Sequence, residues 1–287
     1  MGNGVRFETG TYGLRAVLTG PWSEETAHSV VAHGAVELEL NRSKGWRGHD
    51  LRFLETLPHL LVFEILDLGI EDVSAIHALH ALKALDVNTY CSTEIRFSAF
   101  PDLEDCSLEW RARARSVFDC TTLKRLFINR YKGKDTAPFA NLVSLERLGL
   151  LNAPITNVHG LSGLRQLQRL RLGALRCLES LAGIEELTSL ERLNVDTCRR
   201  IRLIDPIVGL THLRELYVNN CGEIESLKPL DGLVSLEAVT FDASTNVRDG
   251  DMSVLTHLPN LSRLAFANRR HYTHRCEEFR AYTNPAP

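Results

Sequence analysis

A short pattern of apolar positions recurs along most of the chain. It consists of one apolar residue, a second three positions later and a third two positions after that, as in Leu145, Leu148 and Leu150. The first members of its ten occurrences are Leu60, Leu82, Leu103, Leu123, Leu145, Leu167, Leu190, Leu213, Leu236 and Leu261. The interval between successive first members ranges from 20 residues (103 to 123) to 25 residues (236 to 261). Such a narrow range indicates a repeat protein of about ten units.

Each unit is predicted to contribute one short strand. The last two apolar residues of the pattern share one face of that strand, and the residue between them faces the other way. Strands of successive units lie parallel, about 4.8 Å apart. The rest of each unit is too short for a full α-helix, which favours 3₁₀ or irregular structure. Because no unit buries its apolar face alone, the predicted fold is an α/β solenoid whose core forms by stacking.

The pattern resembles the leucine-rich repeat family, whose units read L-x-x-L-x-L-x-x-N/C-x-L. The resemblance covers residues 57–268, and the segment from Ile155 to Leu164 is similar to the short-repeat, internalin-like bacterial class. It implies a horseshoe of about ten repeats of 20–25 residues, with a parallel β-sheet on the concave side and an irregular or 3₁₀ convex side. It also implies that partners bind on the concave face.

The ends of a solenoid need caps, because a terminal unit otherwise exposes core side chains and an unpaired strand edge. Residues 15–18 are predicted to form a strand, and a helix is predicted from Ser23, as its N-cap, to about His33. Alternating apolar residues predict another strand over 36–40 that pairs with the first repeat. The predicted organisation is one solenoid domain with an N-terminal cap at 1–56, repeats at 57–268, and a C-terminal cap and tail at 269–287.

Composition narrows the environment and the partners. Apolar residues make up 44% of the 287 residues and charged residues 24%, which excludes a disordered chain. The net charge is −3, so the chain as a whole is not a general polyanion binder. Residues 1–6 fit neither a secretory signal nor the myristoylation pattern, and no apolar stretch is long enough for a membrane helix. The sequence therefore predicts a cytoplasmic protein without membrane contact.

Seven cysteines, an odd number, are spread over the chain and form no disulfide framework. Cys198 and Cys221 stand 23 residues apart at the N/C position of adjacent units. The resemblance implies that side chains at this position hydrogen-bond the turn inside the solenoid, so both are predicted to be buried, reduced thiols. Cys106 replaces a core leucine and Cys120 also falls at an inward position, which suits a small apolar thiol.

The repeat register identifies the residues that face away from the core on the concave side. One row places arginines in four successive units, at positions 125, 147, 169 and 192. Adjacent like charges on a sheet are unfavourable, so either Glu146 and Glu191 neutralise them locally or the row serves an acidic protein partner. The candidate partner-binding residues are Arg125, Phe127, Asn129, Arg147, Arg169, Arg171, Arg192, Asn194, Tyr217, Asn219 and Asp242.

A second concentration of positive charge lies between residues 110 and 134, with eight basic residues and one acidic residue. Its candidate secondary patch consists of Trp110, Arg111, Arg113 and Arg115. Basic residues interleaved with aromatic ones can bind single-stranded nucleic acid, although the acidic balance of the whole chain argues against that partner. A solvated outer turn and a protein contact are the other two interpretations.

Motifs of the common enzyme classes are missing from the sequence, including a phosphate-binding loop, H-E-x-x-H and G-x-S-x-G. His77 and His80 fall within a repeat, where a role as metal ligands is not expected. The densest polar segment combines the Asp-Gly-Asp sequence at 249–251 with His271 and His274, a set that could hold a divalent metal. Asp-Gly-Asp is also a common turn sequence, and the histidines lie where an edge must be covered. A cap is therefore the preferred interpretation, and no catalytic residue, metal or cofactor is assigned.

The sequence thus favours a non-enzymatic module that is monomeric when free and holds another protein, one with an acidic surface, on its concave face. The family resemblance extends this prediction to a bacterial immunity protein or inhibitor that caps a toxin or an enzyme. Two alternatives stay open. One is nucleic-acid binding through the arginine row and residues 110–134. The other is a metal-dependent enzyme that uses the C-terminal Asp/His set.

Overall fold

The computed structural model describes residues 4–282, and their side chains as far as Phe279. Two compact units divide the chain: unit 1 is Met1–Ile128 and unit 2 is Asn129–Pro287. Residues 1–3 of the N-terminal motif and residues 283–287 of the predicted tail lie outside the described residues. Within the described range, no helix combines the length and the apolar character needed to cross a membrane.

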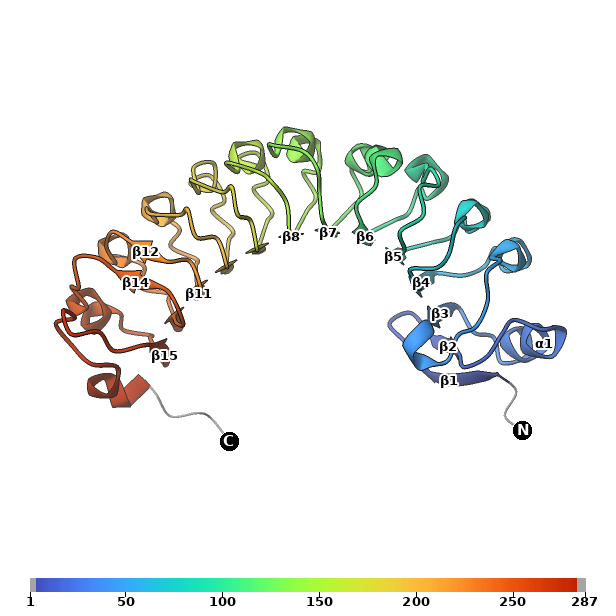
Figure 1. The fold of residues 1–287 in the computed structure, drawn as a ribbon, viewed down its shortest axis with the longest axis horizontal. Coiled ribbons are helices and arrows are strands. Elements are labelled where there is room, and N and C mark those ends of the chain that lie inside the picture. Colours follow the sequence, from blue (N-terminus) through green and yellow to red (C-terminus); the bar gives the residue numbers. More distant parts are fainter. Residues whose placement is uncertain (1–3, 283–287) are drawn as a thin grey trace. The chain divides into compact units, whose positions relative to one another are not determined.

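In unit 1, a sheet lies on one side and short 3₁₀ segments lie on the other (Figure 1). The strands, in the order in which they lie in the sheet, are β1 (Val5–Thr9), β2 (Leu14–Leu18), β3 (Glu37–Asn41), β4 (Val62–Leu66), β5 (Ala84–Asn88), β6 (Asp105–Glu109) and β7 (Arg125–Asn129). β1 and β2 form an antiparallel hairpin, and the pairs from β2 to β6 are parallel. The 3₁₀ segments are η1 (Arg42–Lys44), η2 (Arg52–Thr56), η3 (Ser74–Ala78), η4 (Phe97–Ala99) and η5 (Ala112–Asp119).

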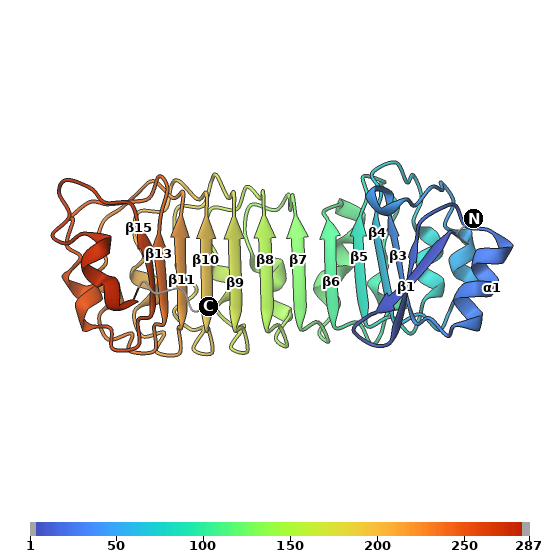
Figure 2. The ribbon, with the colours of Figure 1, turned by 90° about the horizontal axis from the view of Figure 1, so that it is seen from below.

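Unit 2 repeats the same two layers with a parallel sheet (Figure 2). Its strands are, in order, β8 (Arg147–Leu151), β9 (Arg169–Gly173), β10 (Arg192–Asp196), β11 (Glu215–Asn219), β13 (Ala238–Phe241) and β15 (Arg263–Phe266). A separate pair is formed by β12 (Glu223–Ile224) and β14 (Asn246–Val247). The 3₁₀ segments are η6 (Ala137–Asn141), η7 (His159–Leu161), η8 (Asp205–Ile207), η9 (Lys228–Leu230), η10 (Ser253–His257) and η11 (Cys276–Tyr282).

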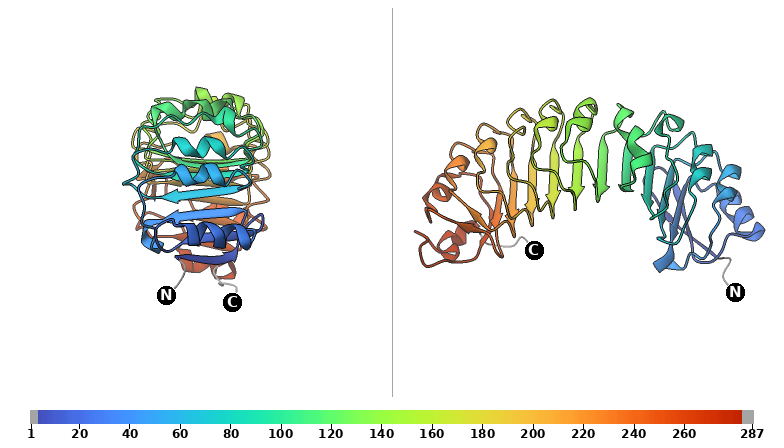
Figure 3. Two further views of the ribbon diagram at one scale, coloured as in Figure 1. Left: turned by 90° about the vertical axis from the view of Figure 1, so that its right-hand side faces the viewer. Right: turned by 45° about the horizontal axis from the view of Figure 1, so that its top comes forward.

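The strand register confirms the predicted solenoid. Leu148 pairs with Leu170, which pairs with Leu193, and all three side chains are buried. The arginine that precedes each leucine, such as Arg147 or Arg169, lies on the opposite face of the sheet. We call this opposite face, whose side chains point away from the core, the open face. The 3₁₀ segments return the chain on the other side of the core, as the repeat length predicts (Figure 3).

The N-terminal elements lie close to where the sequence places them. The predicted first strand is β2, the predicted strand over 36–40 is β3, and the predicted helix is α1 (Glu24–Ala32). Ser23 is the N-cap of α1, and its hydroxyl accepts a hydrogen bond from the N–H of Thr26. β1, which was not predicted, adds an antiparallel strand to the edge of β2. The predicted boundaries of the cap, repeats and tail stay a prediction.

The two cysteines at the N/C position hydrogen-bond the backbone of the turn. Both side chains are fully buried. The thiol of Cys198 donates to the carbonyl oxygen of Asp196, with 3.4 Å between sulfur and oxygen. The thiol of Cys221 donates to the carbonyl oxygen of Asn219 at 3.2 Å. Burial raises the pKa of Cys198 to about 12 and that of Cys221 to about 11, so both stay protonated thiols that donate. Cys106 is buried, as predicted. Cys120 is partly exposed because it lies just after η5 rather than within the core.

The strands from β7 to β13, the short β12 excepted, are each followed by a residue with left-handed backbone. These non-glycine residues with positive φ are Arg130, Asn152, Ala174, Thr197, Asn220 and Ala243. The left-handed conformation costs an L-residue roughly 1–2 kcal/mol. The turn is held by a backbone hydrogen bond to the next repeat, such as the 2.8 Å bond from the N–H of Ala174 to the carbonyl of Asp196. From Arg130 to Asn220, these turns therefore couple one repeat to the next through the backbone.

Ala174→Gly should stabilise unit 2, because glycine adopts φ of 53° without the steric penalty of a methyl group. We expect the free energy of unfolding, measured by denaturant titration, to rise by about 0.5–1 kcal/mol. Ala137→Gly is the matched control, since Ala137 begins η6 and is not among the residues with positive φ. That control should lose about 0.5–1 kcal/mol. Equal losses in both variants would show that the turn at Ala174 is not strained.

Candidate functional site

Three arginines form a cluster on the open face of unit 2. Arg147 of β8 lies directly opposite Arg169 of β9, and Arg171 stands two residues further along β9, opposite Gly149. All three side chains are exposed, and Gly149 places no side chain beside Arg171. Neighbouring strands lie about 4.8 Å apart, so the guanidinium groups project from adjacent points of the sheet. We call Arg147, Arg169 and Arg171 the arginine cluster.

The arginine cluster is not neutralised from within the described part of the chain. No acidic side chain there forms an ion pair with any of its three members. Glu146 and Glu191, which the sequence offered as neutralising residues, use their backbone carbonyls to accept N–H groups of the next strand. Like charges directly opposite each other on a sheet repel. The open face of unit 2 therefore holds an unfavourable concentration of positive charge that an anionic group would relieve.

Arg192 differs from the cluster because it has an acidic partner. Its Nη2 lies 2.6 Å from Oε1 of Glu215, and the hydroxyl of Tyr217 donates to Oε2 of the same carboxylate at 2.6 Å. Arg263 approaches Glu215 from the other side at 3.4 Å. Burial alone would raise the pKa of Glu215, but the hydrogen bonds from Tyr217 and Arg192 lower it overall. Arg192 and Tyr217 are thus held in place at one side of the arginine cluster.

The predicted amide residues divide into two groups. Asn194, opposite Arg171, has a buried Oδ1 without a hydrogen-bond partner in the part of the chain that the structure describes. Asn219 accepts the N–H of Asp242 at 3.0 Å, and Asn129 accepts the side-chain amide of Asn152 at 2.8 Å. Asn129 and Asn219 therefore support the turns at the ends of their strands. Asp242 is exposed, and its carboxylate accepts the N–H of Ala243.

Arg125 and Phe127 belong to β7 in unit 1. The Nε of Arg125 donates to Asp105 on β6 at 2.7 Å, and this hydrogen bond raises the pKa of Arg125. Phe127 is half-buried. Arg125 therefore contributes little unpaired charge, in contrast to the arginine cluster. The predicted row of equivalent arginines is in fact a mixture of paired and unpaired ones.

Arg111, which was assigned to the secondary patch, is buried. This residue follows Leu108 by three positions, which is the N/C position of its unit, and its side chain is only 7% exposed. Arg113 and Arg115 are exposed, and Trp110 is half-buried. The register could have revealed the burial of Arg111, because Cys198 and Cys221 occupy the same position in their units. Local charge alone does not distinguish this inward position from the exposed positions of Arg113 and Arg115.

The C-terminal Asp/His set serves the backbone of the last repeats. His271 Nε2 lies 2.9 Å from the carbonyl of Val247. The carboxylate of Asp249 accepts the N–H of Asp251, and that of Asp251 accepts the N–H of Ser253, whose side chain and N–H lower the pKa of Asp251. No group of three or more His, Cys, Asp or Glu suited to a metal occurs in residues 4–282. These contacts are those of turns and of a covering segment.

The two histidines of the 77–80 pair also bind backbone groups. His77 Nδ1 lies 2.8 Å from the carbonyl of Ser74, and its Nε2 accepts the N–H of Arg96 at 2.9 Å. Burial lowers the pKa of His77. His80 Nδ1 lies 3.1 Å from the carbonyl of Ala99. The ring of His77 is thus fully engaged by the turns around it.

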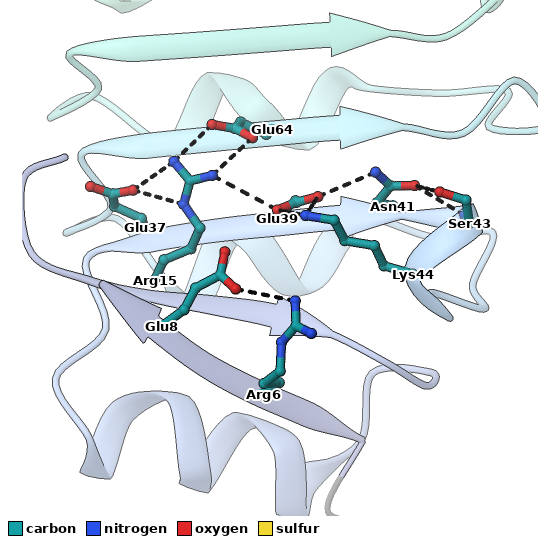
Figure 4. A network of polar contacts seen from close by, with 9 residues as sticks. All are labelled: Arg6, Glu8, Arg15, Glu37, Glu39, Asn41, Ser43, Lys44 and Glu64. Atoms are coloured by element: carbon teal, nitrogen blue, oxygen red, sulfur yellow. Dashed lines mark hydrogen bonds and ion pairs between the residues drawn. The ribbon is translucent and has the colours of Figure 1, made fainter. Parts of the chain in front are cut away.

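The open face of unit 1 carries an acidic network that the sequence analysis missed. Arg15 lies between Glu37 and Glu64, with 2.9 Å from its Nη2 to a carboxylate oxygen of each (Figure 4). Glu37 is fully buried and also accepts the N–H of Tyr12, while Lys44 binds Glu39 at 2.8 Å. The signal was available, because Glu39 and Glu64 occupy in β3 and β4 the outward position between two buried residues that Arg171 occupies in β9.

Asp86 on β5 lies beside this acidic network, and no basic side chain among the described residues forms an ion pair with it. It lies opposite Glu64 on one side and Ser107 on the other, and accepts a hydrogen bond from the amide of Asn88. Burial, with the charge of Glu64 as the next cause, raises the pKa of Asp86 to about 7, against the effect of the Ser107 hydrogen bond. The folded protein therefore binds a proton at Asp86 more tightly than the unfolded chain does.

The free energy of unfolding should fall as pH rises from about 4 to about 7, because the folded state must give up the proton of Asp86 in that window. Asp86→Asn removes this effect, so at pH 8 it should gain on the order of 1–3 kcal/mol over the native protein. Below pH 4 the two should differ little. Denaturant titrations at pH 4, 6 and 8 measure both trends. Asp72→Asn is the control, because hydrogen bonds from Ser74 lower the pKa of Asp72. The same gain in both variants would contradict the role of Asp86.

Comparisons with known proteins point to one fold. No protein-family model matches the chain, and no curated protein matches it. Among solved structures, the internalin InlF from Listeria monocytogenes matches 88% of this chain over 75% of its own, with 21% sequence identity and a TM-score of 0.66. The functional domain of InlJ from the same species, which includes a cysteine ladder, matches 86% of this chain over 51% of its own, with 16% identity and a TM-score of 0.56.

A third structure is that of the mouse RP105/MD-1 complex, which matches 80% of this chain over 43% of its own, with 18% identity and a TM-score of 0.59. Identities this low show the fold alone. The parallel sheet, the 3₁₀ segments on its other side and the cysteines at the N/C position agree with that fold. In its fold, the chain is a leucine-rich repeat protein of the kind seen in the internalins.

Proposed function

We propose that the chain is a non-enzymatic binding protein that holds an acidic protein partner on the open face of unit 2. The observation that carries the proposal is the arginine cluster, in which Arg147, Arg169 and Arg171 are adjacent, exposed and unpaired in the described chain. Repulsion among them is relieved when carboxylates of a partner bind. Arginine and tyrosine also anchor protein interfaces more often than other surface residues do.

The neighbouring side chains suit a bound surface. Arg192 and Tyr217 are fixed by Glu215, so little side-chain entropy is lost when a partner packs against them. The strands from Arg147 to Arg192 span two spacings, about 10 Å, which is the scale of the centre of an interface of about 800 Å² per partner. Mouse RP105, whose fold is similar, was solved in a complex with MD-1. Binding of a partner by this fold is thus compatible with the proposal.

The finer parts of the proposal follow from the same chemistry. A protein that neutralises its partner by covering it, such as an immunity protein or inhibitor, fits a rigid charged face without catalytic side chains. The seven free cysteines fit a reducing compartment such as the cytoplasm. The repulsion within the arginine cluster also disfavours pairing of two such faces, so we expect a monomer when no partner is bound.

Arg169→Glu tests this function. It places a carboxylate between Arg147 and Arg192, which replaces repulsion by attraction, so the melting temperature should stay the same or rise. Binding of an acidic partner should fall about 100-fold, because like charges then face each other across the interface. Affinity capture from native lysate identifies the partner, and calorimetry with the purified partner gives the loss.

The matched control is Arg113→Glu with Arg115→Glu, which reverses two exposed arginines of the outer turn in unit 1. This variant should bind the partner as the native protein does. Loss of binding in the control but not in Arg169→Glu would place the surface on that turn. Recovery of nucleic acid that nuclease treatment removes, with binding that weakens steeply as salt increases, would instead favour the nucleic-acid alternative.

A further inference from the structure

A buried guanidinium contacts a cysteine in unit 1. Arg111 lies just after β6 and is the N-cap residue of η5, whereas Thr89 and Cys91 follow β5 in the preceding repeat. Nη1 of Arg111 lies 2.9 Å from Sγ of Cys91, and Nη2 lies 3.1 Å from the carbonyl oxygen and 3.0 Å from the hydroxyl oxygen of Thr89. Arg111 is 7% exposed and Cys91 8%.

The directions of these hydrogen bonds make the sulfur an acceptor. A guanidinium has donors only, so Arg111 donates both to the sulfur of Cys91 and to the hydroxyl oxygen of Thr89. The hydroxyl proton of Thr89 is then free to point at the sulfur, which lies 3.2 Å away. Two donors therefore converge on Sγ. In Cys198 and Cys221 the arrangement is reversed, because those thiols donate to backbone carbonyls.

The charge of Arg111 also favours a sulfur that accepts hydrogen bonds at Cys91. No carboxylate in residues 4–282 forms an ion pair with this guanidinium, and its Nε is buried without a hydrogen-bond partner. A buried cation without a counter-charge is strongly unfavourable. Cys91 is the acidic group in direct contact with it. Loss of the thiol proton supplies the missing negative charge, and two donors are already oriented toward the sulfur that carries it.

We propose that Arg111 and Thr89 hold Cys91 as a thiolate, and that this thiolate is a modification site for small hydroperoxides. The thiolate, not the thiol, is the nucleophile. Its sulfur attacks one oxygen of hydrogen peroxide, so that an S–O bond forms as the O–O bond breaks. The sulfur is oxidised to a sulfenic acid, and the second oxygen leaves as hydroxide, which takes a proton from water. The low exposure of Cys91 restricts the reaction to small reagents.

The pH profile of alkylation tests the protonation state without depending on access to the site. Iodoacetamide labelling of the native protein is followed for each cysteine by peptide mass spectrometry at pH 6.5 and 9.5. An ordinary thiol that titrates near 8.5 gives a ratio of the two rates of about 0.01. We expect Cys91 to give a ratio near 1, and Cys177, which is partly exposed, is followed alongside it as a reference. A ratio of about 0.01 for Cys91, or no labelling at either pH, would overturn the proposal.

Variants then assign the cause. Arg111→Gln should lower the Cys91 ratio by more than tenfold, whereas Arg113→Gln, which removes an exposed charge from the same segment, should leave it unchanged. Thr89→Val keeps the guanidinium and removes one of the two donors, so it should lower the Cys91 ratio several-fold. This variant tests the proposal if Arg111→Gln does not fold. Cys106 is buried in the same unit and should stay unlabelled in every folded variant. A Cys91 ratio that is the same in all variants would show that neither side chain controls the sulfur.

Oxidation is measured on the same protein. After a brief exposure to hydrogen peroxide at pH 6.5, dimedone traps sulfenic acids, and peptide mass spectrometry locates them. We expect at least tenfold more adduct at Cys91 than at Cys177 in the native protein, and equal amounts in Arg111→Gln. Equal adduct at the two cysteines of the native protein would refute the peroxide reaction even if the alkylation ratio is near 1.

Discussion

Each repeat of this chain depends on its neighbours to bury its apolar side chains. In β8, for example, the buried residues Leu148 and Leu150 lie directly opposite the buried residues Leu170 and Leu172 of the next strand. This constraint determines which way the other residues of the repeat point. Residues between the buried ones must lie on the open face, and residues three positions after the strand's last buried one must lie inside the turn. The chemistry of the protein is distributed over those two kinds of position.

This constraint explains why the fold could be predicted from the sequence and the site only in part. The spacing of the leucines gives each residue its position within the repeat. From that position the strands, the 3₁₀ side and the burial of Cys198 and Cys221 could be predicted. Arg111 was predicted to be exposed but is buried, because it lies at the inward N/C position of its repeat. Pairing between repeats is harder to predict, because a hydrogen bond such as that from Arg192 to Glu215 depends on side-chain rotamers as well as on register. The unpaired state of Arg169 has no sequence signal, since it consists of missing partners.

The open faces of the two units solve the problem of adjacent charges in different ways. In unit 1, Arg15 and Lys44 neutralise three glutamates, and Asp86 relieves the remaining repulsion by keeping a proton up to about pH 7. In unit 2, arginines cannot respond by releasing a proton, because the guanidinium stays charged at any physiological pH. An arginine cluster therefore keeps its repulsion until an external anion binds, which is why we propose that the partner binds to unit 2.

The N/C position shows how one place in the repeat supports different chemistry. A cysteine there donates to carbonyl oxygens of the turn, and burial holds it as an unreactive thiol. When arginine takes the position, as at Arg111, the backbone carbonyl is still satisfied, but the group now brings a positive charge and further donors into the core. That charge must be balanced by the preceding repeat, where Cys91 is the contacting acid. The same structural role thus protects one cysteine from reaction and activates another, according to which side of the hydrogen bond the sulfur occupies.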